Sequence, residues 1–149
     1  MSVSESVVLS YIGTAMWSSH VMLPETEENL VDGCMDVPEG HHLHGVSEQD
    51  NLDDHYDWED LTDEAYESMK SDVNRFFDSL EIQGLLEDAN EHNNDEHIAH
   101  DFWLTRNGHG AGFWDGDYEE ELGEKLTELA KAYGECNLCV NCDGQVEIL

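Results

Sequence analysis

The first 69 residues contain no lysine or arginine, and this feature constrains the fold more than any other part of the sequence. Seventeen aspartates and glutamates precede Lys70, the first basic residue. Over all 149 residues, 36 acids stand against 5 bases, and the formal net charge is −31. Such self-repulsion destabilises a compact state, so we expect the charge to serve a function. It disfavours nucleic acid and membranes as direct partners and favours cations or basic protein surfaces.

The hydrophobic content of 39% in a chain of this length is sufficient for one domain with a core, which we assign to residues 1–149. The N-terminus lacks a basic segment followed by a long apolar one, and no run approaches 18 apolar residues. The sequence therefore predicts neither a signal peptide nor a membrane span. We expect the four cysteines to be thiols, as in other cytosolic chains.

Apolar residues recur every three or four positions in several segments, which is typical of helices with one buried face. Thr62 and Gly134 are suited to capping the start and the end of two of these helices. Gly123, inside the last one, would allow close packing at a cost of roughly 1 kcal/mol against alanine. The predicted helices span residues 4–19, 61–80, 82–89 and 117–134.

The aromatic segment HDFWLTRNGHGAGFWD begins at His100 and predicts a β-hairpin. Four of the six residues 101–106 favour a strand, and Asn107-Gly108 is a strong signal for a two-residue turn. The second strand would span 109–114, and Trp103 and Trp114 would supply much of the core. A second hairpin is predicted over 137–141 and 145–149, around Asp143-Gly144.

The order of these elements predicts an α+β fold with a ββαββ C-terminal half. Its mainly antiparallel sheet would carry helices packed on one face. Periodicity disappears over residues 21–60, which are rich in acids and glycines. This segment is predicted to be a long acidic loop or insertion with short helical turns, partly disordered.

The sixteen-residue segment at His100, followed by a helix, a short strand, Asp143-Gly144 and a last strand, resembles a family of small, acidic, uncharacterised bacteriophage proteins. The resemblance covers roughly residue 61 to the C-terminus. It implies a viral origin and a place in the cytoplasm of a bacterial host. It implies no activity.

Three cysteines have the spacing C-x2-C-x2-C, at Cys136, Cys139 and Cys142, and Cys34 is a candidate fourth zinc ligand. In a strand, however, residues three apart lie about 10 Å apart and point to opposite faces. We therefore favour semi-buried thiols and assign no metal and no cofactor.

The nine histidines include two sets that suit a transition metal by residue type, but neither contains a helical pair at i and i+4. Solvated loop histidines are the favoured interpretation, and the negative field would hold their protons more tightly. The two sets are His41, His42 and His44, and His92, His97 and His100.

The glycine-rich run NGHGAG lacks the lysine and serine or threonine that complete a phosphate-binding loop. The sequence also lacks G-x-S-x-G, H-E-x-x-H and calcium-loop signatures. We predict that the protein is not an enzyme and assign no catalytic residue.

The acidic excess itself predicts the function. Carboxylates on helices and loops can approach the charge density of DNA, which is one charge per roughly 1.7 Å of duplex axis. The predicted function is a phage-encoded DNA mimic that occupies the DNA-binding groove of a basic host defence protein, of anti-restriction or anti-CRISPR type. The predicted mimic surface comprises Glu25, Glu27, Glu28, Asp53, Asp54, Asp57, Glu59, Asp60, Asp63, Glu64, Glu67, Glu87, Asp88, Glu91, Asp95 and Glu96.

Within this surface, residues 53–67 are the favoured contact because they form the longest base-free acidic run beside a well-defined helix. Glu119, Glu120 and Glu121 form a further acidic cluster. Two alternatives stay open at this point. The acids can reflect halophilic adaptation of a protein with an unrelated function, or the histidines and cysteines can serve a small metal-binding or hydrolytic protein. Homodimer formation is also left open.

Overall fold

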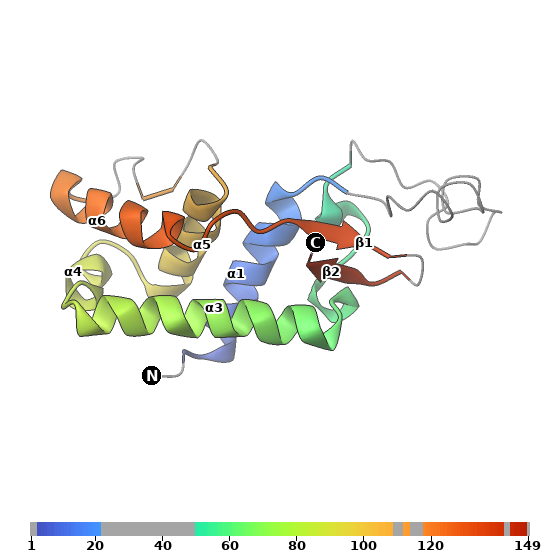
Figure 1. The fold of residues 1–149 in the computed structure, drawn as a ribbon, viewed down its shortest axis with the longest axis horizontal. Helices are drawn as coiled ribbons and strands as arrows, with labels where there is room; N and C mark the ends of the chain where they lie inside the picture. Colours follow the sequence, from blue (N-terminus) through green and yellow to red (C-terminus); the bar gives the residue numbers. More distant parts are fainter. Residues whose placement is uncertain (1–2, 22–49, 109–111, 114–117, 142–143, 149) are drawn as a thin grey trace. The chain divides into compact units, whose positions relative to one another are not determined.

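A computed structural model describes residues 3–21, 50–108, 112–113, 118–141 and 144–148, and every structural statement below concerns these residues. They contain five α-helices, two short 3-10 helices and two strands (Figure 1). The chain divides into two compact units, each described here by itself. The first comprises Met1–Ala15 and Glu67–Cys136, and the second comprises Met16–Tyr66 and Asn137–Leu149. The assignment of 1–149 to a single domain stays a prediction.

The predicted mainly antiparallel sheet with a ββαββ C-terminal half is wrong, because the described residues are mostly helical. Among the helices that the structure describes, none combines the length and the apolar character needed to cross a membrane. The helices are α1 (Glu5–Ser18), α3 (Asp63–Ile82), α4 (Leu86–Asn90), α5 (Asp95–Arg106) and α6 (Glu120–Lys131).

The predicted helices over 4–19, 61–80 and 117–134 correspond to α1, α3 and α6. Of the predicted helix over 82–89, Ile82 ends α3 and residues 86–89 belong to α4, with a break at 83–85. The Thr62 hydroxyl accepts a hydrogen bond from the Ala65 N–H at 3.1 Å, which confirms its capping role at the start of α3. Gly134 follows α6 with φ of +75°, as expected for a left-handed C-terminal stop.

The central hairpin predicted from residue 101 onward is wrong, because 101–106 form the end of α5. Asn94 caps this helix through a hydrogen bond to its side chain from the His97 N–H. Asn107-Gly108 ends it, with Gly108 at φ of +70°. All six residues of 101–106 are buried, so no exposed face separates helical from strand periodicity. Of the predicted second strand, Gly112 and Phe113 form a bend and a turn, and the rest lies outside the described residues.

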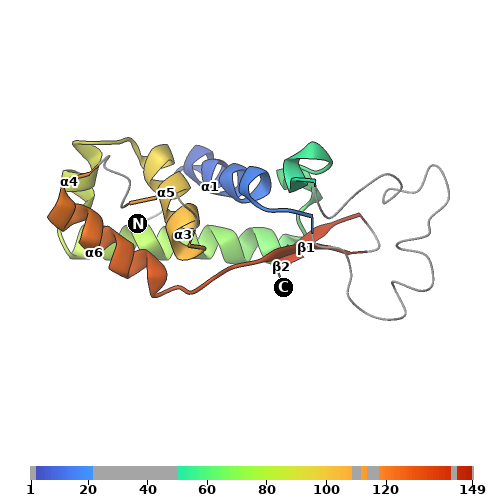
Figure 2. The same ribbon diagram turned by 90° about the horizontal axis from the view of Figure 1, so that it is seen from above.

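The core of the first unit is a cluster of aromatic rings contributed by several helices. Phe76 of α3 stacks on Phe102 of α5, with ring centroids 4.1 Å apart and planes 3° apart. Tyr11 of α1 also stacks on Phe102, with ring centroids 5.2 Å apart. It meets Trp103 edge to face, with centroids 5.4 Å apart. Trp103 is buried, as predicted, whereas Trp114 lies outside the described residues. Figures 1 and 2 both show α5 beside α6, consistent with the contacts between them.

The second unit contains the predicted C-terminal hairpin. Strands β1 (Leu138–Val140) and β2 (Val146–Ile148) pair in antiparallel register, with Cys139 opposite Glu147. The residues just before α3 also bond to β2, because the Thr62 N–H donates to the Val146 carbonyl at 2.9 Å.

Part of the predicted acidic loop over 21–60 is ordered into local structure. Residues 50–60 contain two 3-10 helices, η2 (Leu52–Asp54) and η3 (Trp58–Asp60). Leu52 and Tyr56 are buried between the acids and anchor this stretch in the second unit. Residues 22–49 lie outside the described part of the chain.

Candidate functional site

The structure describes thirteen of the sixteen predicted surface residues, and Glu25, Glu27 and Glu28 lie outside it. Eleven of the thirteen are exposed, and Asp60 and Asp95 are half-buried. These carboxylates are therefore accessible to a partner. Most belong to the 3-10 helices or to the starts of α3, α4 and α5, whereas Asp57 precedes η3 and Glu91 follows α4.

The acids of residues 53–60 have a local structural role that the sequence did not reveal. The Asp54 carboxylate accepts a hydrogen bond from the Asn51 N–H at 3.0 Å, at the start of η2. The Asp60 carboxylate accepts one from the Asp57 N–H at 2.9 Å, and the Asp57 carboxylate accepts one from the Glu59 N–H at 2.9 Å. Reversing these three charges would remove helix caps as well as charge.

A similar role applies to the acids that begin the α-helices. Each of α3, α4 and α5 has two carboxylates in its first turn, where the helix dipole favours negative charge. The Asp95 carboxylate additionally accepts a hydrogen bond from the Asn90 amide at 2.8 Å. The pairs are Asp63 and Glu64, Glu87 and Asp88, and Asp95 and Glu96.

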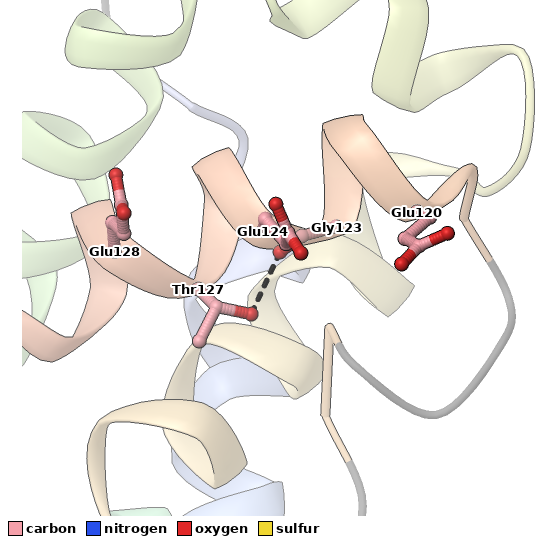
Figure 3. A pocket seen from close by; sticks show the side chains of 5 residues that line it. All are labelled: Glu120, Gly123, Glu124, Thr127 and Glu128. Atoms are coloured by element: carbon pink, nitrogen blue, oxygen red, sulfur yellow. Dashed lines mark hydrogen bonds between the residues drawn. The ribbon is translucent and has the colours of Figure 1, made fainter.

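Helix α6 carries the most regular row of carboxylates. Glu120, Glu124 and Glu128 are exposed and line an open cleft of about 560 Å³ together with Gly123 and Thr127 (Figure 3). They recur every four residues, so successive side chains on this face lie about 6 Å apart along the axis. Our sequence analysis noted Glu120 but missed the other two, although the i+4 spacing was the available signal.

Few bases are placed to neutralise this surface. Lys125 lies 3.6 Å from Glu121, one turn away on α6. Arg106 is buried instead, where its guanidinium donates to the Asp72 carboxylate at 2.9 Å and to the Tyr11 hydroxyl at 3.0 Å. It also donates to the carbonyls of Tyr133 and Gly134, just after α6. This base therefore holds the first unit together and leaves the surface charge unchanged.

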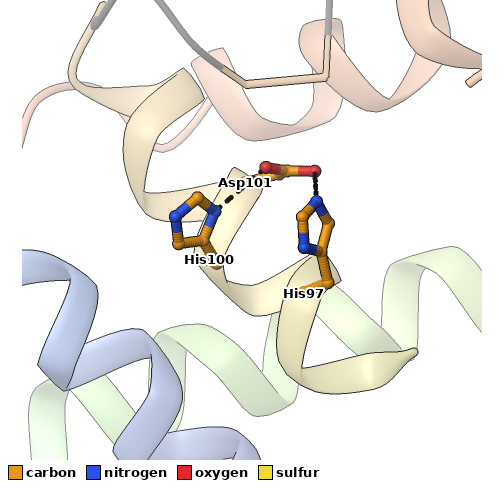
Figure 4. A group of neighbouring side chains, drawn as sticks. All are labelled: His97, His100 and Asp101. Carbon is orange, nitrogen blue, oxygen red and sulfur yellow. Dashed lines mark hydrogen bonds and ion pairs between the residues drawn. The ribbon is translucent and has the colours of Figure 1, made fainter. Parts of the chain in front are cut away.

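A second cluster of titratable groups lies on α5, where the sequence had predicted a loop and a strand. Nε2 of His97 lies 3.3 Å from one carboxylate oxygen of Asp101, and Nδ1 of His100 lies 3.1 Å from the other (Figure 4). The Tyr118 hydroxyl donates to the Asp101 carboxylate at 3.1 Å. Burial raises the pKa of Asp101, and its polar contacts with His100, His97 and Tyr118 offset part of this rise.

The predicted strand contains one of the three closely spaced cysteines. Cys139 lies in β1, whereas Cys136 precedes it. Cys136 and Cys139 are buried, and burial raises the pKa of the Cys136 thiol. Cys34 and Cys142 lie outside the described residues, as do His41, His42 and His44.

Comparisons of the chain with protein-family models, with curated proteins and with solved structures found no match.

Proposed function

We propose that this chain is a phage-encoded acidic DNA mimic that occupies the DNA-binding groove of a basic host protein. Five glutamates and one lysine between Glu119 and Glu128 leave a net charge of −4 on this stretch. The stretch is about 14 Å long, at roughly 1.5 Å per residue. A single DNA strand carries one charge per roughly 3.4 Å of axis. The similar average charge per length is the observation that carries the proposal.

The scaffold supports the same function. Carboxylates on a helix are held at fixed separations, so a partner that binds them loses little of its gain to ordering a flexible chain. The row of Glu120, Glu124 and Glu128 is exposed along its length and borders a cleft in which basic side chains would fit. Release of small counterions from the basic partner would add to the affinity, as it does when such a protein binds DNA.

The class of target rests on the resemblance to phage proteins. A phage gains from blocking a host defence protein that binds DNA, such as a restriction enzyme or a CRISPR surveillance complex. The sixteen carboxylates predicted from the sequence remain the proposed wider surface, and the row on α6 extends it. Capture from a lysate of the bacterial host, followed by elution with a salt gradient, identifies the partner.

Charge reversal then tests whether the α6 row makes the contact. The variant Glu120→Lys, Glu124→Lys, Glu128→Lys should weaken binding at least tenfold more than a control with the same change in net charge. Three other exposed glutamates supply that control, as Glu5→Lys, Glu81→Lys, Glu135→Lys. Equal losses in the two variants would mean that only the total charge matters and would contradict the proposed contact.

Halophilic adaptation is the competing explanation for the charge, and it predicts a different folding behaviour. A halophilic protein needs screening by molar salt to overcome its self-repulsion. The proposed mimic should instead be fully folded at about 0.15 M salt, where charges more than about 8 Å apart are largely screened. Circular dichroism of the full chain across a salt series separates the two explanations. Loss of helical signal below about 1 M salt would favour halophilic adaptation.

A further inference from the structure

The cluster on α5 has the composition and the geometry of a metal site. His97, His100 and Asp101 occupy positions i, i+3 and i+4, so the helix places them on one face (Figure 4). One potential ligand atom from each residue lies within 4.8 Å of the other two. We propose that these three side chains bind one zinc ion, which is a site beyond the proposed DNA mimicry.

The distances suit this ion. Tetrahedral zinc with bonds of about 2.0–2.1 Å to nitrogen and oxygen keeps neighbouring ligand atoms about 3.3 Å apart. His97 Nε2 lies 3.3 Å from one Asp101 carboxylate oxygen and His100 Nδ1 lies 3.1 Å from the other, and both separations are close to this value.

The donor set selects the class of metal. Two imidazole nitrogens with one carboxylate oxygen suit zinc and its first-row neighbours, whereas magnesium and calcium prefer oxygen ligands alone. Three protein ligands leave one position of a tetrahedral ion for water or another small ligand. Both histidine side chains are partly exposed, at 40% for His97 and 30% for His100, although the Nε2 atom of His97 is itself buried.

The surroundings orient the ligands as metal sites require. Asp101 is only 1% exposed, and the hydroxyl of Tyr118 donates to its carboxylate at 3.1 Å. A hydrogen bond of this kind fixes a carboxylate ligand and is typical of the groups that surround a bound metal. The two imidazole rings lie nearly parallel, with centroids 5.4 Å apart and planes 27° apart. The negative charge of the whole chain favours a divalent cation here.

Isothermal titration of the purified full chain with zinc chloride tests the site. We expect one zinc ion per chain, retained in the presence of a large excess of magnesium. His97→Gln and His100→Gln should each weaken zinc binding at least tenfold. His92→Gln is the matched control, because His92 is exposed and its ring lies against Tyr118 without belonging to the cluster.

A variant in which all four cysteines are replaced by serine should keep the zinc ion. The proposal is overturned if the wild type binds no zinc, or if magnesium displaces it. It is also overturned if zinc binding survives both histidine substitutions or disappears with the cysteines. His97→Gln alone decides the matter if His100→Gln does not fold, because the His97 side chain is the most exposed of the three.

Discussion

The two compact units differ in how their carboxylates are compensated. All five lysines and arginines of the sequence belong to the first unit, where Arg106 is buried against Asp72 and joins three helices. The second unit contains no lysine or arginine. There, Asp54, Asp57 and Asp60 accept hydrogen bonds from backbone N–H groups at the starts of the 3-10 helices.

This difference indicates that acids in a chain with few bases need not all be surplus charge. Backbone N–H groups at helix starts carry partial positive charge and can replace lysine or arginine as partners. The carboxylates most available to another molecule are then those away from helix starts, such as Glu124 and Glu128 on α6. A mutation should therefore have a different effect depending on whether it removes a base, a cap or an exposed acid.

Removal of the buried base should have the largest effect. Arg106→Ala leaves Asp72, the Tyr11 hydroxyl and two carbonyls after α6 without their donor. We expect the free energy of unfolding to fall by about 3–5 kcal/mol, as for other broken buried ion pairs. Urea denaturation of the full chain measures this loss.

Arg75→Ala is the control for this prediction. Arg75 is exposed, and its guanidinium lies over the Tyr133 ring at 5.9 Å from the centroid. Its loss should cost at most about 1 kcal/mol, the range of an exposed cation–π contact. If both arginine variants lose the same stability, the buried base has no special role in the first unit.

Gly123 should respond to substitution with an intermediate loss. A Cβ atom added at this position would lie 2.7 Å from the Phe113 carbonyl oxygen, closer than real Cβ contacts allow. We expect Gly123→Ala to cost about 1–3 kcal/mol, as for overpacked cores. Gly13→Ala in α1 is the matched control, because a Cβ there meets nothing within 4 Å. That variant should gain up to about 1 kcal/mol from helix propensity, and the opposite ranking in thermal unfolding would contradict the packing.

The smallest change in stability is expected at Asp57 in the second unit, where two substitutions separate its capping role from its charge. Asp57→Ala removes the acceptor at the start of η3 and should cost about 1 kcal/mol. Asp57→Asn removes the same charge but keeps an acceptor oxygen, so its stability should stay close to that of the wild type. If the alanine variant is instead more stable than wild type in urea denaturation, repulsion outweighs capping at this residue.

Amphipathic periodicity was sufficient to predict α1, α3 and α6 from the sequence. These helices alternate buried and exposed faces, and glycine or threonine marks their ends, as at Gly134 and Thr62. The C-terminal hairpin was predicted for a similar reason, because Gly144 with φ of +82° turns the chain between two short strands.

The same reasoning failed for α5 because its C-terminal half is buried on every side. With no polar face, a run such as 101–106 contains no periodicity that separates helix from strand. Asn107-Gly108 follows the end of α5, although the same dipeptide is also typical of a two-residue hairpin turn. The failure also concealed the metal-ligand cluster, because His97 and Asp101 share a face only if the segment is helical.

Competition with DNA is the measurement that tests the central claim most directly. A host protein captured by the full chain is bound to labelled duplex DNA, and the acidic chain is then titrated at several salt concentrations. We predict that the chain displaces the DNA and that its affinity falls steeply with salt, because both ligands release counterions from the same groove. Simultaneous binding of DNA and the chain, with an affinity insensitive to salt, would contradict the account.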